Sequence, residues 1–307
     1  MEGFSSLVVK NLQHYKKKTL IALRRIRCAA NAPILQQPIF IIGCSRAGTT
    51  LVYKTFSESA EIGSLQKETH DFWTALHPLR EREWNSHAIP KEYACETDRE
   101  CIASYFFTQT GSTHIVDKNN QNGLSIPYLS ALFPDAHFVF IKRSPGDNIG
   151  SLIQGWGKYE EYGAWSENLP EKVNISEGKY SRWCFFLADG WRQYAFSPIE
   201  EVCAFQYVSM NKAILSAKNV VPAGQWHELF YEQVVNDPVR EFEQVFKACN
   251  LTFNDDLRHH CSEVISKPYN AFSEVRIDKW KTGEDREKIE RILPAVKETA
   301  ENLGYSI

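Results

Sequence analysis

The sequence predicts a three-layer α/β/α fold with a short central parallel sheet. Two apolar runs, residues 39–42 and 137–141, are too short for helices and rich in β-branched and aromatic side chains, as buried parallel strands are. A short polar loop follows each run, and an apolar pattern of helical period follows the loop. Strand, loop and helix in this order are typical of α/β sheets, which bind ligands at the carboxyl ends of their strands.

Residues 1–37 differ from the rest of the chain and predict a basic helical segment ahead of a single domain, residues 38–307. The segment contains seven lysine or arginine residues and one glutamate. No uncharged run in it approaches the roughly 18 residues that a membrane span needs, and the order of a signal peptide is missing. We expect an amphipathic helix that packs on the domain, with a helix on a membrane surface as the alternative.

The first strand leads into a loop between Gly43 and Gly48 that predicts an anion site. The first N–H groups of a helix are unpaired, and the helix dipole favours negative charge there. The spacing is close to that of a nucleotide P-loop, and Thr50 matches its serine or threonine. Thr49, however, stands where a P-loop has its lysine, which disfavours a triphosphate with Mg²⁺. Arg46 supplies a fixed positive charge instead, unless the segment is only a structural turn.

The second apolar run ends in Lys142 and Arg143, where a Mg²⁺-dependent phosphotransferase would have an aspartate. Pro145 opens the next predicted helix, because its missing N–H costs nothing at that position. Ser151 lies about two turns into that helix. The planar, permanently charged fork of arginine and the hydroxyl of serine both suit a phosphate.

These two segments resemble those of the sulfotransferases that use 3′-phosphoadenosine 5′-phosphosulfate (PAPS). Residues 45–50 are similar to the 5′-phosphosulfate loop P-[KR]-S-G-T-T, with Ser45 in place of proline, and residues 143–151 match the R-x-P-x-x-x-x-x-S pattern that holds the 3′-phosphate. The resemblance implies a P-loop-NTPase-like fold, PAPS as cosubstrate and the desulfonated nucleotide PAP as product. It assigns donor binding to Arg46, Ala47, Gly48, Thr49, Thr50, Arg143 and Ser151, where Ala47 replaces a serine.

The segment QKETHDFW is similar to the K-E-x-H-F-F segment of heparan-sulfate sulfotransferases, which implies Glu68 as the general base. The attacking hydroxyl or amine must lose a proton as the S–O bond forms, and we place Glu68 before His70 as its acceptor. Lys118 follows a predicted strand at 114–116 and resembles the lysine that faces the transferred sulfuryl group. The catalytic residues are therefore predicted to be Glu68, Lys118, Arg46 and His70.

Three further regions complete the prediction. Tyr231 lies in a segment that resembles the family's R-Y-E-D-L-x-x-D-P, with Phe230 in place of the arginine. Lys279, Trp280 and Lys281 precede a predicted closing helix, and we expect them to fold over the adenine and the 3′-phosphate. Apolar and aromatic residues at helical spacing predict helices at residues 182–196 and 200–217.

Residues 157–178 contain five glutamates and two lysines, and predict a loop beside the acceptor. We expect Glu160, Glu161 and Trp165 to contact it through charge and ring faces, although a solvated loop with buried anchors has the same composition. The predicted reaction is sulfuryl transfer to a hydroxyl or to an amine or carbamoyl nitrogen of a small molecule, such as a natural product of the saxitoxin-type guanidinium alkaloids. The alternatives are a glycan (heparan-like) sulfotransferase, a P-loop phosphotransferase or a non-catalytic adenine-nucleotide-binding protein.

Composition limits the remaining classes. A net charge of −3 and a pI near 6.3 give no signature of nucleic-acid binding. The eight cysteines form no C-x-x-C pair, and the one cysteine near histidines, Cys261 after His259 and His260, is interpreted as part of a polar helix face. Scattered cysteines are typical of a reducing compartment. We therefore predict a cytoplasmic enzyme without a metal, and leave a homodimer open.

Overall fold

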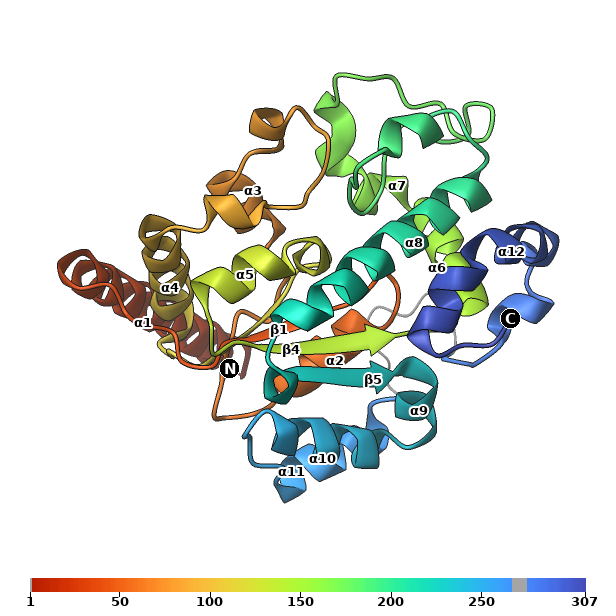
Figure 1. Ribbon diagram of the computed structural model, residues 1–307. Helices are drawn as coiled ribbons and strands as arrows, with labels where there is room; N and C mark the ends of the chain where they lie inside the picture. The colour runs from red at the N-terminus through yellow and green to blue at the C-terminus, as the bar shows by residue number, and fades with distance from the viewer. Residues whose placement is uncertain (1, 267–274) are drawn as a thin grey trace.

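The computed structural model describes residues 2–266 and 275–307 and confirms the predicted arrangement of α/β/α layers (Figure 1). Five parallel strands form one sheet in the order β2-β3-β1-β4-β5. The strands are β1 (Ile39–Ile42), β2 (Gly63–Ser64), β3 (Ile115–Lys118), β4 (His137–Lys142) and β5 (Trp226–Phe230). The α-helices are α1 (Glu2–Ala30), α2 (Thr49–Phe56), α3 (His70–Leu76), α4 (Glu96–Thr110), α5 (Ile126–Leu132), α6 (Pro145–Trp156), α7 (Tyr159–Tyr162), α8 (Ile199–Ala217), α9 (Tyr231–Asn236), α10 (Pro238–Ala248), α11 (Asp255–Glu263) and α12 (Arg286–Leu303).

The central strands are held by apolar side chains on both faces of the sheet. Every residue of β1 and β4 is buried, and Phe40 stacks on Phe138 with 5.7 Å between ring centroids. A fully buried side chain of this kind stabilises the fold by about 1.5–3 kcal/mol. Because β1 pairs with both β3 and β4, the carboxyl ends of these three strands lie side by side. The loop after β1, Lys118 and Arg143 therefore meet at one edge of the sheet.

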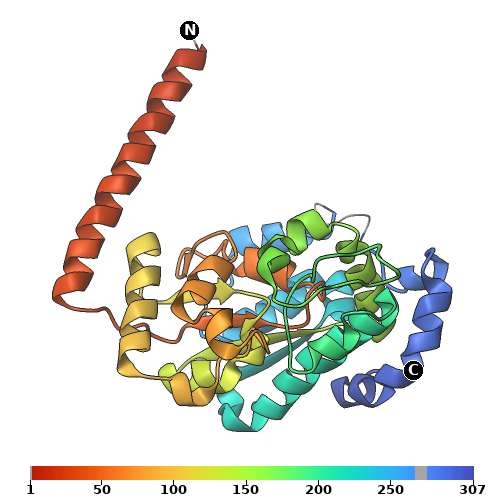
Figure 2. The same cartoon turned by 90° about the horizontal axis from the view of Figure 1, so that it is seen from above.

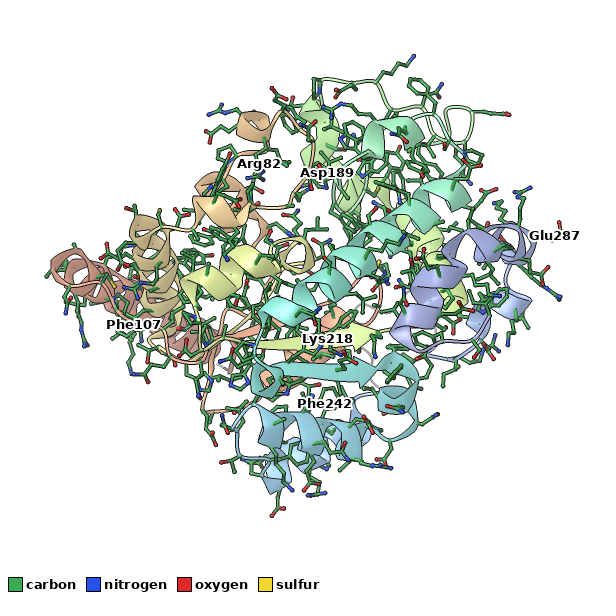
Figure 3. All side chains as sticks on the ribbon, viewed as in Figure 1. Arg82, Phe107, Asp189, Lys218, Phe242 and Glu287 are labelled. Atoms are coloured by element: carbon green, nitrogen blue, oxygen red, sulfur yellow. The ribbon has the colours of Figure 1, made fainter. Side chains whose placement is uncertain are left out.

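Helices cover the two faces of the sheet. On one face α2 packs against α10, where Phe56 stacks on Phe246 with 4.4 Å between ring centroids. Figure 3 shows Phe242 on α10 beneath β5, and its side chain is fully buried. On the other face α8 lies against α5, α6 and α12. The three layers leave the carboxyl edge of the sheet between them.

The prediction of a helix at residues 182–196 is wrong. The structure has irregular chain there with one short 3₁₀ turn, and Phe185 and Gly190 have φ angles of 68° and 86°, which an α-helix excludes. The indole N–H of Trp183 donates to the carbonyl oxygen of Phe186 at 2.7 Å. A buried indole thus pairs with a carbonyl that a helix would have paired with a backbone N–H. The helical spacing of the aromatic residues reflects filling of the core.

Helix α1 is present and projects from the domain (Figure 2). Its contacts with α4 come from its last turns, where Arg24 Nη1 donates to the carbonyl oxygen of Thr108 at 3.4 Å and the Arg27 guanidinium lies 5.5 Å from the ring of Phe107. The last turns of α1 therefore contact α4. In the described part of the chain, none of the helices combines the length and apolar character that a membrane crossing requires.

Candidate active site

A cavity of about 1050 Å³ lies at the carboxyl ends of β1, β3 and β4. This is the edge at which parallel α/β sheets bind ligands, and the volume exceeds that of most sites for one drug-sized molecule. The cavity brings together most of the predicted site residues. Its wall includes Arg46, Gly48, Thr49, Thr50, Glu68, His70, Lys118, Arg143, Ser151, Glu161, Trp165, Tyr231, Lys279 and Trp280.

Three predicted site residues do not line this cavity. Ala47 is buried, and its N–H closes the loop by donating to the carbonyl oxygen of Cys44 at 3.0 Å. Glu160 is exposed on the outer side of α7. Lys281 turns away to pair with Asp278 at 2.8 Å. Each of them lies beside a residue that does line the cavity, and sequence position alone does not show which way a side chain points.

The loop after β1 has the backbone of an anion cradle. Gly48 precedes α2 with a φ of 107°, and a Cβ at this position would lie 2.7 Å from the ring of Tyr231. Arg46 has a φ of 67°, a left-handed conformation that costs a non-glycine residue about 1–3 kcal/mol. In the described chain no side chain caps the N-terminus of α2. The loop therefore presents an uncapped helix N-terminus and one guanidinium to the cavity.

Two arginines converge on this end of the cavity. Arg143 Nη1 donates to the carbonyl oxygen of Arg46 at 2.8 Å, and its guanidinium lies 4.2 Å from the ring of Tyr231. Burial lowers the pKa of Arg46, the neighbouring Tyr162 opposes this, and the positive charge of Arg143 lowers it further. Nε of Arg143 is buried and has no hydrogen-bond partner among the described residues. A ligand with several anionic oxygens fits these donors.

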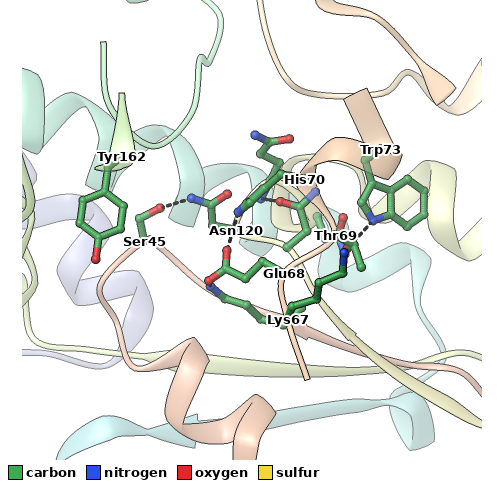
Figure 4. A network of polar contacts seen from close by, with 12 residues as sticks. Ser45, Lys67, Glu68, Thr69, His70, Trp73, Asn120 and Tyr162 are labelled. Atoms are coloured by element: carbon green, nitrogen blue, oxygen red, sulfur yellow. Dashed lines mark hydrogen bonds and ion pairs between the residues drawn. The ribbon is translucent and has the colours of Figure 1, made fainter. Parts of the chain in front are cut away.

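Glu68 lines the cavity between Lys118 and His70, and Figure 4 shows its contact with His70. Its carboxylate accepts a hydrogen bond from Lys118 Nζ at 2.5 Å and contacts His70 Nε2 with its other oxygen. Burial alone would raise the pKa of Glu68, but the ammonium of Lys118 and the imidazole of His70 more than offset it and hold the pKa well below its usual range. Nδ1 of His70 is buried and has no hydrogen-bond partner in the described chain.

Asp117 positions the side chains of this cluster through hydrogen bonds. No sequence motif indicated this role. Its buried carboxylate accepts three hydrogen bonds, from Thr69 Oγ1 at 2.7 Å, Asn122 Nδ2 at 3.0 Å and Trp73 Nε1 at 3.1 Å. Burial raises the pKa of Asp117, and these hydrogen bonds oppose the rise. Because Asp117 precedes Lys118 in β3 and holds the residue between Glu68 and His70, it positions all three side chains. The signal available in the sequence was an acidic residue at a strand end.

The segment before α12 forms part of the cavity wall near Arg143. The carboxylate of Asp147, in the first turn of α6, accepts hydrogen bonds from the backbone N–H groups of Asp278 at 2.7 Å and Trp280 at 3.3 Å. The indole of Trp280 lies so close to Gly146 that a Cβ there would be 2.3 Å from its Nε1. A glycine and an aspartate on α6 therefore hold the tryptophan in the cavity wall.

A family model described as the sulfotransferase family matches residues 38–184 and 175–255. The chain belongs to the sulfotransferase family. No curated protein matches its sequence.

Solved sulfotransferases are similar to this chain at low sequence identity. Sulfotransferase STF9 from Mycobacterium avium is 12% identical over 88% of this chain and 78% of its own, with a TM-score of 0.53, which shows the fold alone. The sulfotransferase domain of the Synechococcus PCC 7002 olefin synthase is 15% identical over 90% and 98% of the two chains, with a TM-score of 0.49. A mouse sulfotransferase complexed with PAP is 12% identical over 87% and 85%, with a TM-score of 0.44.

The other half of the sulfotransferase cavity has a mostly apolar and aromatic wall. His87 and Trp165 meet edge to face with 4.8 Å between ring centroids, and Leu79 and Trp84 lie in the same wall. Burial, followed by the positive charge of Arg82, lowers the pKa of His87 to about 3. His87 is therefore a neutral part of the wall.

Charged side chains in this half are few. Asp71, Arg80 and Glu161 line the cavity, and no sequence motif grouped these three residues. Of the two glutamates predicted to contact the acceptor, Glu161 faces the cavity, whereas Glu160 lies 3.6 Å from Arg182 at the surface. Arg276, which no sequence motif indicated, adds a further cation to the cavity wall.

Proposed function

We propose that this sulfotransferase moves the sulfuryl group of PAPS to a hydroxyl or to an amine or carbamoyl nitrogen of a small molecule. One observation carries the proposal: Arg46, Arg143 and the uncapped N-terminus of α2 converge at one end of a cavity whose middle holds Glu68 and Lys118. The first group fits the anionic ends of the donor, and the second provides proton transfer and charge neutralisation.

The residues of the donor end fit the parts of PAPS. Arg46 and the first N–H groups of α2 suit the 5′-phosphosulfate. Arg143, whose Nε is buried without a partner among the described residues, and Ser151 suit the 3′-phosphate. Trp280 offers a ring face to the adenine. The donor supplies the activated sulfuryl group, and the chain's own residues bind it, orient it and handle the proton.

In the proposed transfer, the acceptor oxygen or nitrogen forms a bond to sulfur as the bond from sulfur to the bridging phosphate oxygen breaks. Lys118 stabilises negative charge on the moving group and the departing oxygen. Glu68 or His70 accepts the acceptor's proton. When Lys118 turns to an anionic donor, Glu68 loses its main counter-charge, so its pKa rises and it becomes a stronger base.

The experiment compares two nucleotides by calorimetry. Arg143→Ala should weaken the binding of PAP at least about tenfold, because a lost charge-assisted hydrogen bond is worth about 1.5–3 kcal/mol. Binding of the analogue without the 3′-phosphate should change far less. Arg182→Ala removes a surface arginine outside the cavity and is the matched control. A change below about twofold for PAP would contradict the donor assignment.

The acceptor proposed is small, and neutral or cationic, with a saxitoxin-type guanidinium alkaloid as the named example. Glu161, Asp71 and the ring of Trp165 support a cation, whereas Arg80 opposes one. Glu161→Lys should raise the KM of a cationic acceptor and leave that of PAPS unchanged. Glu160→Lys is the matched control, because its side chain is directed to the surface. Efficient turnover of heparan would count against a small acceptor.

A cytoplasmic location stays part of the proposal. All eight cysteines are free thiols, and five of them are buried. Free thiols are typical of a reducing compartment.

A further inference from the structure

A second cluster of ligand side chains lies at the ends of the strands opposite to the active-site cavity. His137 is the first residue of β4, His227 is the second residue of β5, and Cys249 follows the last residue of α10. Each offers one ligand atom, and these atoms all lie within 4.8 Å of one another. Within residues 2–266 and 275–307 no other histidine, cysteine, aspartate and glutamate side chains form such a group.

The fold, and not a sequence motif, brings these residues together. Val139 of β4 pairs with His227 of β5, so His137, two residues earlier, projects from the same face of the sheet. The two histidines are 90 residues apart in the chain. Cys249 comes to them from the end of α10. This separation explains why the spacing of cysteines and histidines along the sequence did not indicate a site.

The two imidazoles are hydrogen-bonded to each other, and their nitrogens lie about half an ångström closer than two ligands of one zinc ion would. Nδ1 of His137 and Nε2 of His227 are 2.8 Å apart, and the rings are nearly parallel at 12°. Tetrahedral Zn²⁺ with Zn–N bonds of about 2.0–2.1 Å places two nitrogens about 3.3 Å apart. The pair must therefore open by about 0.5 Å. The sulfur must approach each nitrogen by up to about 1.2 Å, because Zn–S bonds of about 2.3 Å place nitrogen and sulfur about 3.6 Å apart.

We propose that His137, His227 and Cys249 bind a Zn²⁺ ion that joins β4, β5 and α10. Two imidazoles and a thiolate are the ligands that zinc prefers, and the cluster contains no carboxylate for Mg²⁺ or Ca²⁺. His137 and Cys249 are 3% and 0% exposed, whereas His227 is half-buried and leaves a path from solvent. Water completes the coordination, and the thiol loses its proton when the ion binds.

The role of this zinc is structural. The ligands lie at the amino end of β4, and the residues of the sulfuryl-transfer cavity follow its carboxyl end, about 17 Å away along the strand. An ion at this place connects the edge strand β5 and helix α10 to the neighbouring strand β4. It does not touch the donor, the acceptor or the proposed base.

The test uses the full-length chain purified without chelators. We expect about one zinc per chain by plasma mass spectrometry, and a thiolate-to-metal absorption band after replacement with Co²⁺. Cys249→Ser should abolish the band and weaken zinc binding at least about 100-fold, since even changes in the residues around a metal's ligands cost 10–100-fold. Cys261→Ser, at another buried cysteine, is the matched control and should keep both.

Further measurements separate this site from other zinc binding. His227→Gln is the second variant, because a half-buried side chain tolerates substitution; circular dichroism verifies its folding. Removal of zinc with EDTA should lower the Tm of the wild type and leave its initial rate unchanged. The site is refuted if folded wild-type protein takes up no zinc, which leaves a histidine–histidine hydrogen bond only, or if either variant retains zinc at wild-type affinity. A fall in rate with EDTA while the protein stays folded refutes the structural role.

Discussion

At the scale of single residues, the ion pair between Lys118 and Glu68 determines, in the proposed mechanism, which group accepts the acceptor's proton. The two side chains are 2.5 Å apart and both lie in the cavity, so Glu68 is a weak base until the pair opens. An anionic donor beside Lys118 competes for the ammonium and releases the carboxylate. His70 contacts the same carboxylate and is the alternative acceptor. The order of the two bases thus depends on whether the donor is bound.

Substitution of the two residues distinguishes these bases. Glu68→Gln keeps the size and removes the basicity of the side chain, so kcat should fall on the order of 10²–10⁴-fold while the Kd of PAP is retained. Rapid-quench kinetics and calorimetry measure the two quantities. Glu160→Gln, at a surface carboxylate, is the control. If His70→Asn lowers kcat more than Glu68→Gln does, His70 is the base and Glu68 only orients it.

The residues that could be predicted from the sequence are those that end strands inside short motifs. Arg46, Lys118 and Arg143 each follow a buried apolar run, and parallel strands bring such positions to one edge. Asp117 could not be predicted as a support, because its hydrogen-bond partners come from α3 and from the turn after β3. Its role exists only after those elements have come together.

At the scale of elements, the segment before α12 depends on one carboxylate of α6. Asp147→Ala removes the acceptor of the N–H groups of Asp278 and Trp280. We expect PAP to bind roughly tenfold more weakly, because the lost hydrogen bonds to a charged group are worth about 1.5–3 kcal/mol and the tryptophan is no longer held. Calorimetry measures the affinity, and limited proteolysis measures the order of the segment.

Lys281→Ala removes an exposed ion pair of the same segment and should leave the affinity unchanged. Equal losses in the two variants would show that general disturbance of the segment, and not the carboxylate of Asp147, is responsible.

The strands and long helices of this protein were predictable because the spacing of apolar residues in each one matches the face that it buries. The segment 182–196 was not, since its tryptophans occupy the core at helical spacing while their N–H groups pair with backbone carbonyls. Two α-helices, α9 and α10, follow β5. The start of α10 was recognisable, because its N-cap Asp237 accepts a hydrogen bond from the N–H of Arg240, whereas no described side chain caps the start of α9.

At the scale of the whole molecule, stability should depend on pH through His87. Its pKa is lowered to about 3 by burial, and it is near 6.5 in an unfolded chain. Between these values the unfolded chain binds a proton that the native state does not. The free energy of unfolding therefore rises with pH across this window, by up to about 1.4 kcal/mol per pH unit, and the contribution is complete above the unfolded pKa.

Urea denaturation at several pH values checks this slope. The N–H of Leu187 donates to Nδ1 of His87 at 2.7 Å. His87→Asn keeps an acceptor for this N–H and removes the titrating imidazole. The variant should show a shallower slope between pH 4 and 6.5, whereas His259→Asn, at an exposed histidine, should match the wild type. Identical slopes in all three proteins would exclude His87 as the source.

The arrangement of the whole chain was only partly predictable. The parallel sheet follows from the alternation of strands and helices, but the projection of α1 and the meeting of His137, His227 and Cys249 depend on distances that a sequence does not contain. Local pattern therefore predicts the ligand edge of this protein better than its opposite edge.

The position of Trp280 has a consequence for the timing of turnover. In the proposed donor complex, the nucleotide lies beside Trp280, which the bonds to Asp147 hold in place. The acceptor half has its own wall, which includes α3 residues and the residues around Trp84 and Trp165. We therefore expect release of the spent nucleotide to require opening of this segment, whereas exchange of acceptor and sulfated product does not. A first turnover faster than all later ones would reveal this, and the steady rate would report the opening of a peptide segment and not the breaking of a sulfur–oxygen bond.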